Sequence, residues 1–144
     1  MPPRAAEARD DQNSRATLSI VADIERLIDE IDLPLNLEMA ATEEMLQIAL
    51  AHKPHAVCLV PERREERTTD GGLDVNGGEN FLSVFVGRLT DAGIRVSVFI
   101  EASEGQLEAA RRIASPVVEL HAGAYCNAVG AERDAQLERI IGGA

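Results

Sequence analysis

Short apolar segments alternate with helical segments along this chain, and this order constrains its fold more than any other feature. The apolar segments have the length of strands and cover residues 34–40, 55–61, 94–101 and 117–122. The segments around them carry apolar residues at three- and four-residue steps, which predicts helices from Ser19, from Thr42, over 79–92, from Ser103 and over 131–141. Strands separated by helices form a parallel sheet through right-handed crossovers, so we expect an α/β fold.

Missing motifs narrow the choice among parallel folds. No glycine-rich dinucleotide turn and no P-loop sequence follows a predicted strand, so a nucleotide-binding doubly wound sheet is unsupported. We therefore expect a partial TIM (β/α)8 barrel over residues 19–144, with about four of the eight strands and with open edges that favour self-association. Residues 1–18 combine two prolines with many charges and no sustained apolar period, so we expect a disordered leader there.

Composition excludes several classes of function. With 144 residues and 45% hydrophobic content, the chain can bury one core. A net charge of -11 and scattered basic residues argue against nucleic-acid binding, and no run approaches the length of a membrane span, so we expect a cytoplasmic protein. Cys58 lies in an apolar run and Cys126 in an expected loop, so neither a disulfide nor a metal site is predicted.

Glu38 is the first candidate for chemistry. Leu35, Leu37 and Met39 alternate with Asn36 and Glu38, so the pleat of the strand turns the two polar side chains to the face opposite the apolar ones. A carboxylate at the carboxyl end of a buried strand is costly unless it is paired or used. Two interpretations stay open, a structural glutamate paired with an arginine or a backbone amide, and a catalytic acid or base.

The last predicted strand repeats this arrangement. Glu119 and His121 share one parity, opposite to the apolar residues between them, and Glu101 ends the strand before it. Catalytic groups of barrels come from the carboxyl ends of strands, and a histidine near a carboxylate makes a workable proton-transfer pair. We therefore expect Glu119 and His121 to line an active site, although a structural role is the more common one for a histidine at a strand end.

The longest polar segment of the chain holds the run Arg67–Gly72. Its hydroxyl groups, arginine and glycine-freed backbone amides suit an anionic ligand such as a phosphate. A solvated turn is the alternative, but the length of the segment favours an active-site lid.

Five segments together resemble the pyridoxine 5'-phosphate synthase family, in order and in spacing. They are Asn36–Met45 (NLEMAATEEM), His55–Glu62 (HAVCLVPE), Arg67–Val75 (RTTDGGLDV), Asp91–Ile100 (DAGIRVSVFI) and Glu119–Tyr125 (ELHAGAY). The resemblance covers about residues 22–141. It implies a (β/α)8 barrel, a homo-oligomer, and condensation of 1-deoxy-D-xylulose 5-phosphate with 3-amino-2-oxopropyl phosphate in vitamin B6 biosynthesis, without an organic cofactor. It also implies that Glu38 is an acid/base residue and that Thr68 binds substrate.

The chain departs from the family pattern at both ends. Motifs of the family's first two strands and of its seventh and eighth have no match here, so we expect this chain to correspond to the third to sixth strands and to be impaired as a catalyst. The alternative is a non-catalytic half-barrel that acts as an oligomerisation or interaction module.

Overall fold

A computed structural model describes residues 5–68 and 71–144. They divide into two compact units, with the boundary between Leu35 and Asn36. The first unit contains helix α1 (Ala5–Glu30), which begins well before the predicted start at Ser19. Residues 5–18, expected to be disordered, are therefore helical, and residues 1–4 lie outside the described residues. Alanine and arginine, both strong helix formers, make up six of the residues in 5–18, and no glycine or proline interrupts α1.

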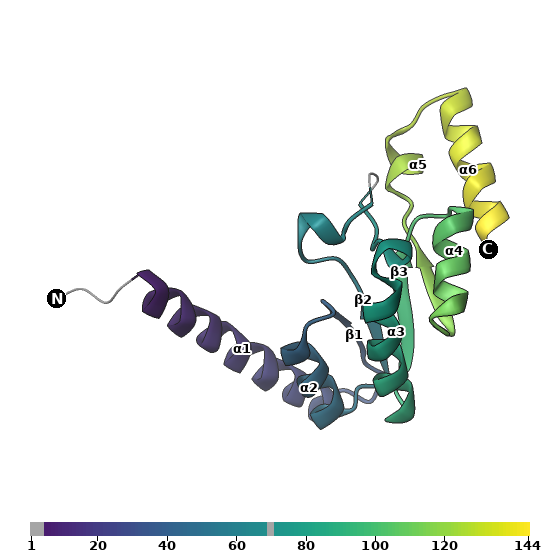
Figure 1. Cartoon of the computed structure of the whole chain (residues 1–144). Coiled ribbons are helices and arrows are strands. Elements are labelled where there is room, and N and C mark those ends of the chain that lie inside the picture. The colour runs from purple at the N-terminus through teal and green to yellow at the C-terminus, as the bar shows by residue number, and fades with distance from the viewer. Residues whose placement is uncertain (1–4, 69–70) are drawn as a thin grey trace. The chain divides into compact units, whose positions relative to one another are not determined.

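The second unit is a parallel sheet of four strands with helices between them (Figure 1). The strands are adjacent in the order β1 (Asn36–Met39), β2 (Ala56–Leu59), β3 (Arg95–Ile100) and β4 (Val117–Leu120). Helices α2 (Glu43–His52), α3 (Val75–Asp91) and α4 (Glu104–Arg112) connect them, and a 3-10 turn, η1 (Arg64–Glu66), precedes α3. The predicted α/β fold with a parallel sheet is confirmed.

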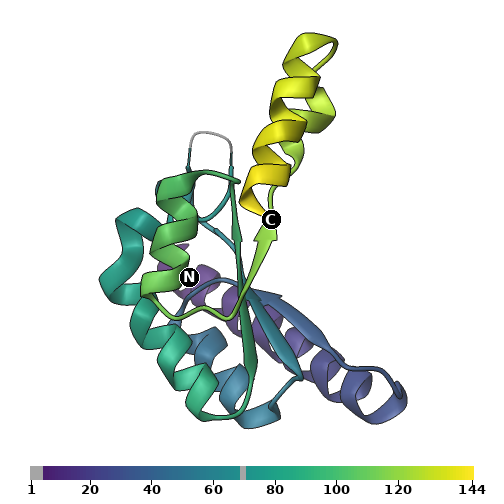
Figure 2. The same cartoon turned by 90° about the vertical axis from the view of Figure 1, so that its right-hand side faces the viewer.

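One face of the sheet, here called the apolar face, packs against the helices. It carries Leu37, Met39, Val57, Leu59, Val96, Val98, Ile100, Val118 and Leu120, which belong to one continuous core with residues of α2, α3 and α4. Figure 2 shows these three helices on the same side of the strands. Strand β2 is buried along its whole length, as expected for a parallel strand in the middle of a sheet.

The helix ends follow local capping rules, with two departures from the predictions. Thr42 caps α2 by accepting a hydrogen bond from the Met45 amide at 3.3 Å, and Gly93 takes a φ of 81° after α3. Helix α3 begins at Val75 and not near residue 79, because the Asp74 carboxylate accepts from the Gly77 amide at 3.0 Å and caps the chain earlier. Ser103 occupies the N-cap position of α4, but its side chain makes no capping hydrogen bond.

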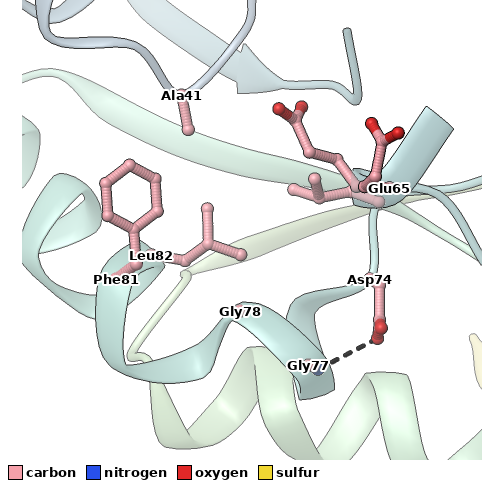
Figure 3. A pocket seen from close by; sticks show the side chains of 9 residues that line it. Ala41, Glu65, Asp74, Gly77, Gly78, Phe81 and Leu82 are labelled. Atoms are coloured by element: carbon pink, nitrogen blue, oxygen red, sulfur yellow. Dashed lines mark hydrogen bonds between the residues drawn. The ribbon is translucent and has the colours of Figure 1, made fainter. Parts of the chain in front are cut away.

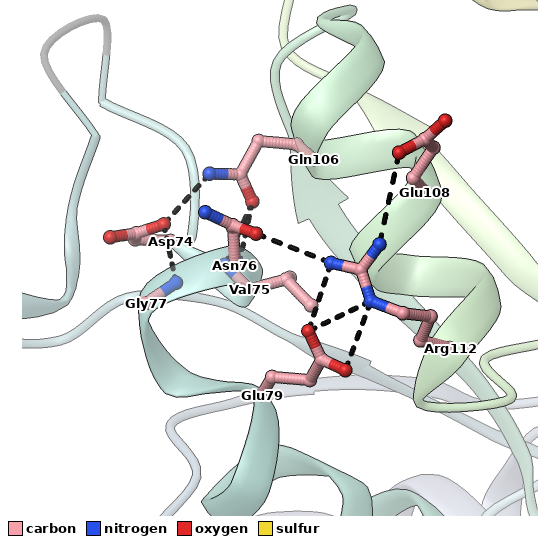
Figure 4. A network of polar contacts seen from close by, with 8 residues as sticks. All are labelled: Asp74, Val75, Asn76, Gly77, Glu79, Gln106, Glu108 and Arg112. Carbon is pink, nitrogen blue, oxygen red and sulfur yellow. Dashed lines mark hydrogen bonds and ion pairs between the residues drawn. The ribbon is translucent and has the colours of Figure 1, made fainter.

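A polar network connects the start of α3 to side chains of α4 (Figure 4). The Gln106 side-chain oxygen accepts from the Val75 amide at 2.9 Å, and its nitrogen donates to Asp74 at 2.7 Å. Arg112 pairs with Glu79 through contacts of 2.9–3.0 Å. These contacts fix the end of the long polar segment relative to the helix layer.

The chain continues beyond β4 through two helices. A short helix, α5 (Gly123–Asn127), was not predicted and includes Cys126, which was expected in a loop; α6 (Ala131–Gly143) matches the predicted last helix. No helix in the described part of the chain has the length and apolar character needed to span a membrane.

Candidate active site

The register of the sheet brings the polar residues of all four strands to one side. Glu38 pairs with Cys58 on β2, Cys58 with Ser97 on β3, and Phe99 on β3 with Glu119 on β4. Residues paired in adjacent parallel strands point to the same face. We call this surface, which carries Asn36, Glu38, Cys58, Ser97 and Glu119, the polar face.

Glu119 links three strands across the polar face. Its Oε1 atom accepts hydrogen bonds from the Ser97 hydroxyl at 2.9 Å and from the Asn36 amide nitrogen at 3.4 Å. Asn36 lies on β1 and Glu119 on β4, the two outer strands, which would stand about 14 Å apart in a flat sheet. Because side chains point away from the plane of a sheet, those of a flat sheet would not meet across that gap, so the contact indicates that the sheet curls, with the polar face on its concave side.

Ser97 was not singled out from the sequence, although the signal was present. It alternates with Val96 and Val98 in an otherwise apolar strand, and it is 5% exposed. A buried hydroxyl needs a partner, and Ser97 finds Glu119. Pairing the predicted strands in register would have placed it there.

Glu38 lies on the predicted face but is exposed, so the expectation of a carboxylate at the end of a buried strand is corrected. The reason is its position on β1, an outer strand of this sheet, where the polar face is uncovered. Its charge and that of Glu119 both act on Cys58.

The pKa of the Cys58 thiol reflects its burial and the negative charges on the polar face. Cys58 is fully buried, as predicted, and burial raises the pKa of its thiol to about 12, with the negative charges of Glu119 and Glu38 adding to the rise against a lowering contact from Ser97. Both cysteines are free. Cys58 is therefore a neutral thiol at physiological pH, poorly suited to nucleophilic attack.

A second group, which we call the rim cluster, lies at the carboxyl ends of β3 and β4 and comprises Thr68, Gly72, Glu101 and His121. The buried Glu101 carboxylate accepts hydrogen bonds from the Thr68 hydroxyl and from the Gly72 amide, the latter at 2.7 Å. An isolated bridge between Arg67 and Leu73 closes the base of this loop. Thr69 and Asp70, in the middle of the predicted substrate loop, lie outside the described residues.

His121 packs tightly at the end of β4. Its ring meets Phe99 edge-on at 5.1 Å between centroids, and a Cβ atom at Gly123 would stand 2.4 Å from the ring, so a larger residue there would displace the ring. Glu101 and His121 line one small cavity. Among the described residues, His121 Nδ1 is buried without a hydrogen-bond partner.

The four predicted site residues thus fall into two groups. Glu38 and Glu119 share the polar face, while Thr68 and His121 share the rim at the carboxyl ends of the strands. Glu119 and His121 are separated by one residue on the same strand end, which joins the groups. The arrangement offers carboxylates, an imidazole and a hydroxyl at the edge of the sheet where barrels place catalytic groups.

Another hollow, of about 240 Å³, lies beside the start of α3 (Figure 3). Its lining consists of Ala41, Glu65, Glu66, Leu73, Asp74, Gly77, Gly78, Phe81 and Leu82. None of the predicted site residues is in this group, and Asp74 and Glu66 are occupied by backbone amides of their own loop and helix. Within residues 5–68 and 71–144, no three acidic, histidine or cysteine side chains are grouped to hold a metal ion.

Comparison with known proteins is decisive for the family. A family described as "Pyridoxal phosphate biosynthesis protein PdxJ" matches residues 11–144. The chain belongs to the PdxJ family. The parallel strand–helix order and the curled sheet are accordingly those of part of a TIM barrel, as predicted. The family match also begins at residue 11, inside the segment expected to be a disordered leader.

Individual relatives agree with this assignment. The chain is 65% identical over 119 residues to the pyridoxine 5'-phosphate synthase of Rhodospirillum rubrum, an overlap of 82% of this chain and 48% of that protein. It is 60% identical over 127 residues to the enzyme of that name from Jannaschia sp., which covers 85% of this chain and 51% of the relative. The PdxJ chain thus spans about half the length of the curated relatives it matches.

Proposed function

We propose that this chain contributes to the pyridoxine 5'-phosphate synthase reaction, in which 1-deoxy-D-xylulose 5-phosphate and 3-amino-2-oxopropyl phosphate condense to pyridoxine 5'-phosphate, inorganic phosphate and water. Membership of the PdxJ family supports a role in vitamin B6 biosynthesis. The hydrogen bond between Asn36 and Glu119 is the observation that supports the proposal most. It joins the two outer strands, so that Glu38 on β1 and Glu119 on β4 lie over the same concave surface.

The chemistry of the reaction suits these residues. An amine condenses with a carbonyl group, water and phosphate leave, and a ring closes, so protons must be moved at several atoms. Glu38 is accessible for such transfers, and its motif supports an acid/base role. The carboxylates of Glu38 and Glu119 both act on Cys58 and would stabilise a positive charge on a ligand bound to the polar face near this residue. The iminium group that forms from the amine and the carbonyl would carry such a charge.

Thr68 and His121 take supporting parts in this proposal. Thr68 would contact a substrate from the loop that docks on β3, and His121 would exchange protons near Glu119. No organic cofactor is required for these steps. Because the substrates are phosphorylated and do not cross membranes unaided, the reaction is proposed to be cytoplasmic.

An alternative is a non-catalytic module that self-associates. The uncovered polar face and the outer strands β1 and β4 favour it, since unpaired strand edges template association. On this alternative, the chain alone does not turn over substrate. Slow or absent turnover is also expected if the synthase reaction needs strands that the relatives have outside the matched half.

The test is an assay of the purified chain with both substrates, following pyridoxine 5'-phosphate by chromatography and mass spectrometry, with sedimentation to report association. Product formation that Glu38→Gln abolishes supports the synthase role. Association without binding of either substrate supports the module. Turnover that Glu38→Gln leaves unchanged removes Glu38 from the mechanism.

A further inference from the structure

We propose that Glu101 is a positioning residue for Thr68, a role that rests on the proposed substrate site. Glu101 follows the last residue of β3 and is only 5% exposed. A carboxylate buried to this extent is stabilised only if it accepts hydrogen bonds. The substrate loop supplies them, through the Thr68 hydroxyl and the Gly72 amide.

Both arms of the loop meet at this carboxylate. The Thr68 amide donates to the Gly72 carbonyl at 2.9 Å, so the arms are bonded to each other, and both then donate to the same oxygen of Glu101. The next residue, Leu73, donates its amide to the Phe99 carbonyl at 2.7 Å. Glu101 therefore ties the loop to the sheet at Thr68, and Leu73 ties it one step further along.

Glycine at position 72 permits this close approach. A Cβ atom at Gly72 would lie 3.0 Å from both the backbone nitrogen and the Oε1 atom of Glu101. The loop backbone rests directly on the glutamate, with no room for a side chain between them. The approach to the Glu101 backbone nitrogen adds to the hydrogen bonds and places the same two segments together.

The orientation of the Thr68 hydroxyl follows from its bond to Glu101. A threonine hydroxyl has a single proton, and here that proton points to a carboxylate, which forms stronger hydrogen bonds than a neutral oxygen does. The rotation of the side chain is thereby set before any substrate arrives. Without the carboxylate, the Thr68 hydroxyl would keep only a 3.5 Å contact with the Gly72 carbonyl oxygen.

The proposal is tested with Glu101→Met, which keeps the length of the side chain but removes the acceptor, and with Glu101→Gln, which keeps an acceptor oxygen. Glu79→Gln is the matched control, since Glu79 belongs to the separate network with Arg112. Amide exchange of Gly72, measured by NMR in the whole chain, is expected to be about tenfold faster in Glu101→Met, unchanged in Glu79→Gln and intermediate in Glu101→Gln.

Calorimetry with 1-deoxy-D-xylulose 5-phosphate supplies the second measurement. Glu101→Met and Thr68→Val are each expected to weaken binding about tenfold, and the double variant no more than Thr68→Val alone, because Glu101 acts through Thr68. Losses that add in the double variant, or Gly72 exchange that Glu101→Met leaves unchanged, would overturn the proposal. If the unaltered chain binds none of this substrate, the proposed function fails, and Gly72 exchange alone decides whether Glu101 positions the loop.

Discussion

The two faces of the sheet are stabilised by different interactions, the apolar face by packing and the polar face by hydrogen bonds between side chains. Val98 and Ile100 on the apolar face are fully buried under helices, and no polar partner is needed there. One residue away along the same strand, Ser97 on the polar face is buried too, but it bonds to Glu119. The alternation of a β-strand lets six residues of β3 serve both surfaces.

The difference shows which surface maintains the fold, and it leaves the other surface for the proposed chemistry. On the apolar face, stability comes from packing that tolerates no loss of volume. On the polar face, a few hydrogen bonds between side chains link the strands in addition to their backbone pairing, and Glu38 remains accessible. A substitution on the first face should therefore unfold the protein more readily than one on the second.

The largest effect is expected from Ile100→Ala, compared with Ser97→Ala on the same strand. Ile100→Ala leaves a cavity under α3 and α4 and should lower the free energy of unfolding by about 2–5 kcal/mol. Ser97→Ala removes the hydroxyl that donates to Glu119 at 2.9 Å and also lies 3.4 Å from the Val57 carbonyl oxygen, and it should cost about 1 kcal/mol. Urea denaturation of both variants measures the difference, and equal losses would mean that the two faces do not differ as described.

An intermediate effect is expected at the rim, from Gly72→Ala compared with Gly87→Ala. The added methyl group at Gly72 meets the backbone and carboxylate of Glu101 and should cost about 1–3 kcal/mol. Gly87 lies within α3 and faces open space, so Gly87→Ala should stabilise the protein by about 0.5–1 kcal/mol. Thermal unfolding distinguishes them; a neutral Gly72→Ala would show that the loop is not seated on Glu101.

The smallest effect is expected from raising the pH only slightly above 9, where the Cys58 thiol begins to ionise in the unfolded chain. Its pKa is raised from 9.0 to about 12 in the folded chain, so between these values the unfolded thiol ionises first and stability falls as the pH rises. Cys58→Ser should remove this part of the decline. At pH 8, iodoacetamide should label the exposed Cys126 and spare Cys58, as read by peptide mass spectrometry. Rapid labelling of Cys58 in the folded chain would contradict its burial.

The sequence predicted the elements of the sheet better than the surfaces between them. Strand–helix alternation gave the parallel α/β order, and strand parity placed Asn36, Glu38 and Glu119 on one face. Parity does not report curvature, so the contact of Asn36 with Glu119 could not be foreseen from it. Neither could the exposure of Glu38, which depends on its strand being an outer one.

Boundaries failed where side chains from distant residues decide them. Helix α3 begins at Val75 because the preceding Asp74 caps its first turn and because Gln106, far along the chain, accepts from its first amides. Likewise, the sequence marked Glu101 only as a strand end, and its two bonds to the substrate loop depend on how that loop folds back. Local patterns contain no information on such long-range partners.

The most direct test of the central claim is an NMR titration of the chain with 1-deoxy-D-xylulose 5-phosphate. We predict that resonances of Glu38, Thr68, Gly72, Glu119 and His121 shift, because the polar face and the rim cluster form the proposed substrate site. Resonances of core residues in the helix layer, such as Leu46 and Leu89, should stay unchanged. Shifts confined to the hollow beside α3, or no shifts at saturating concentration, would contradict this account.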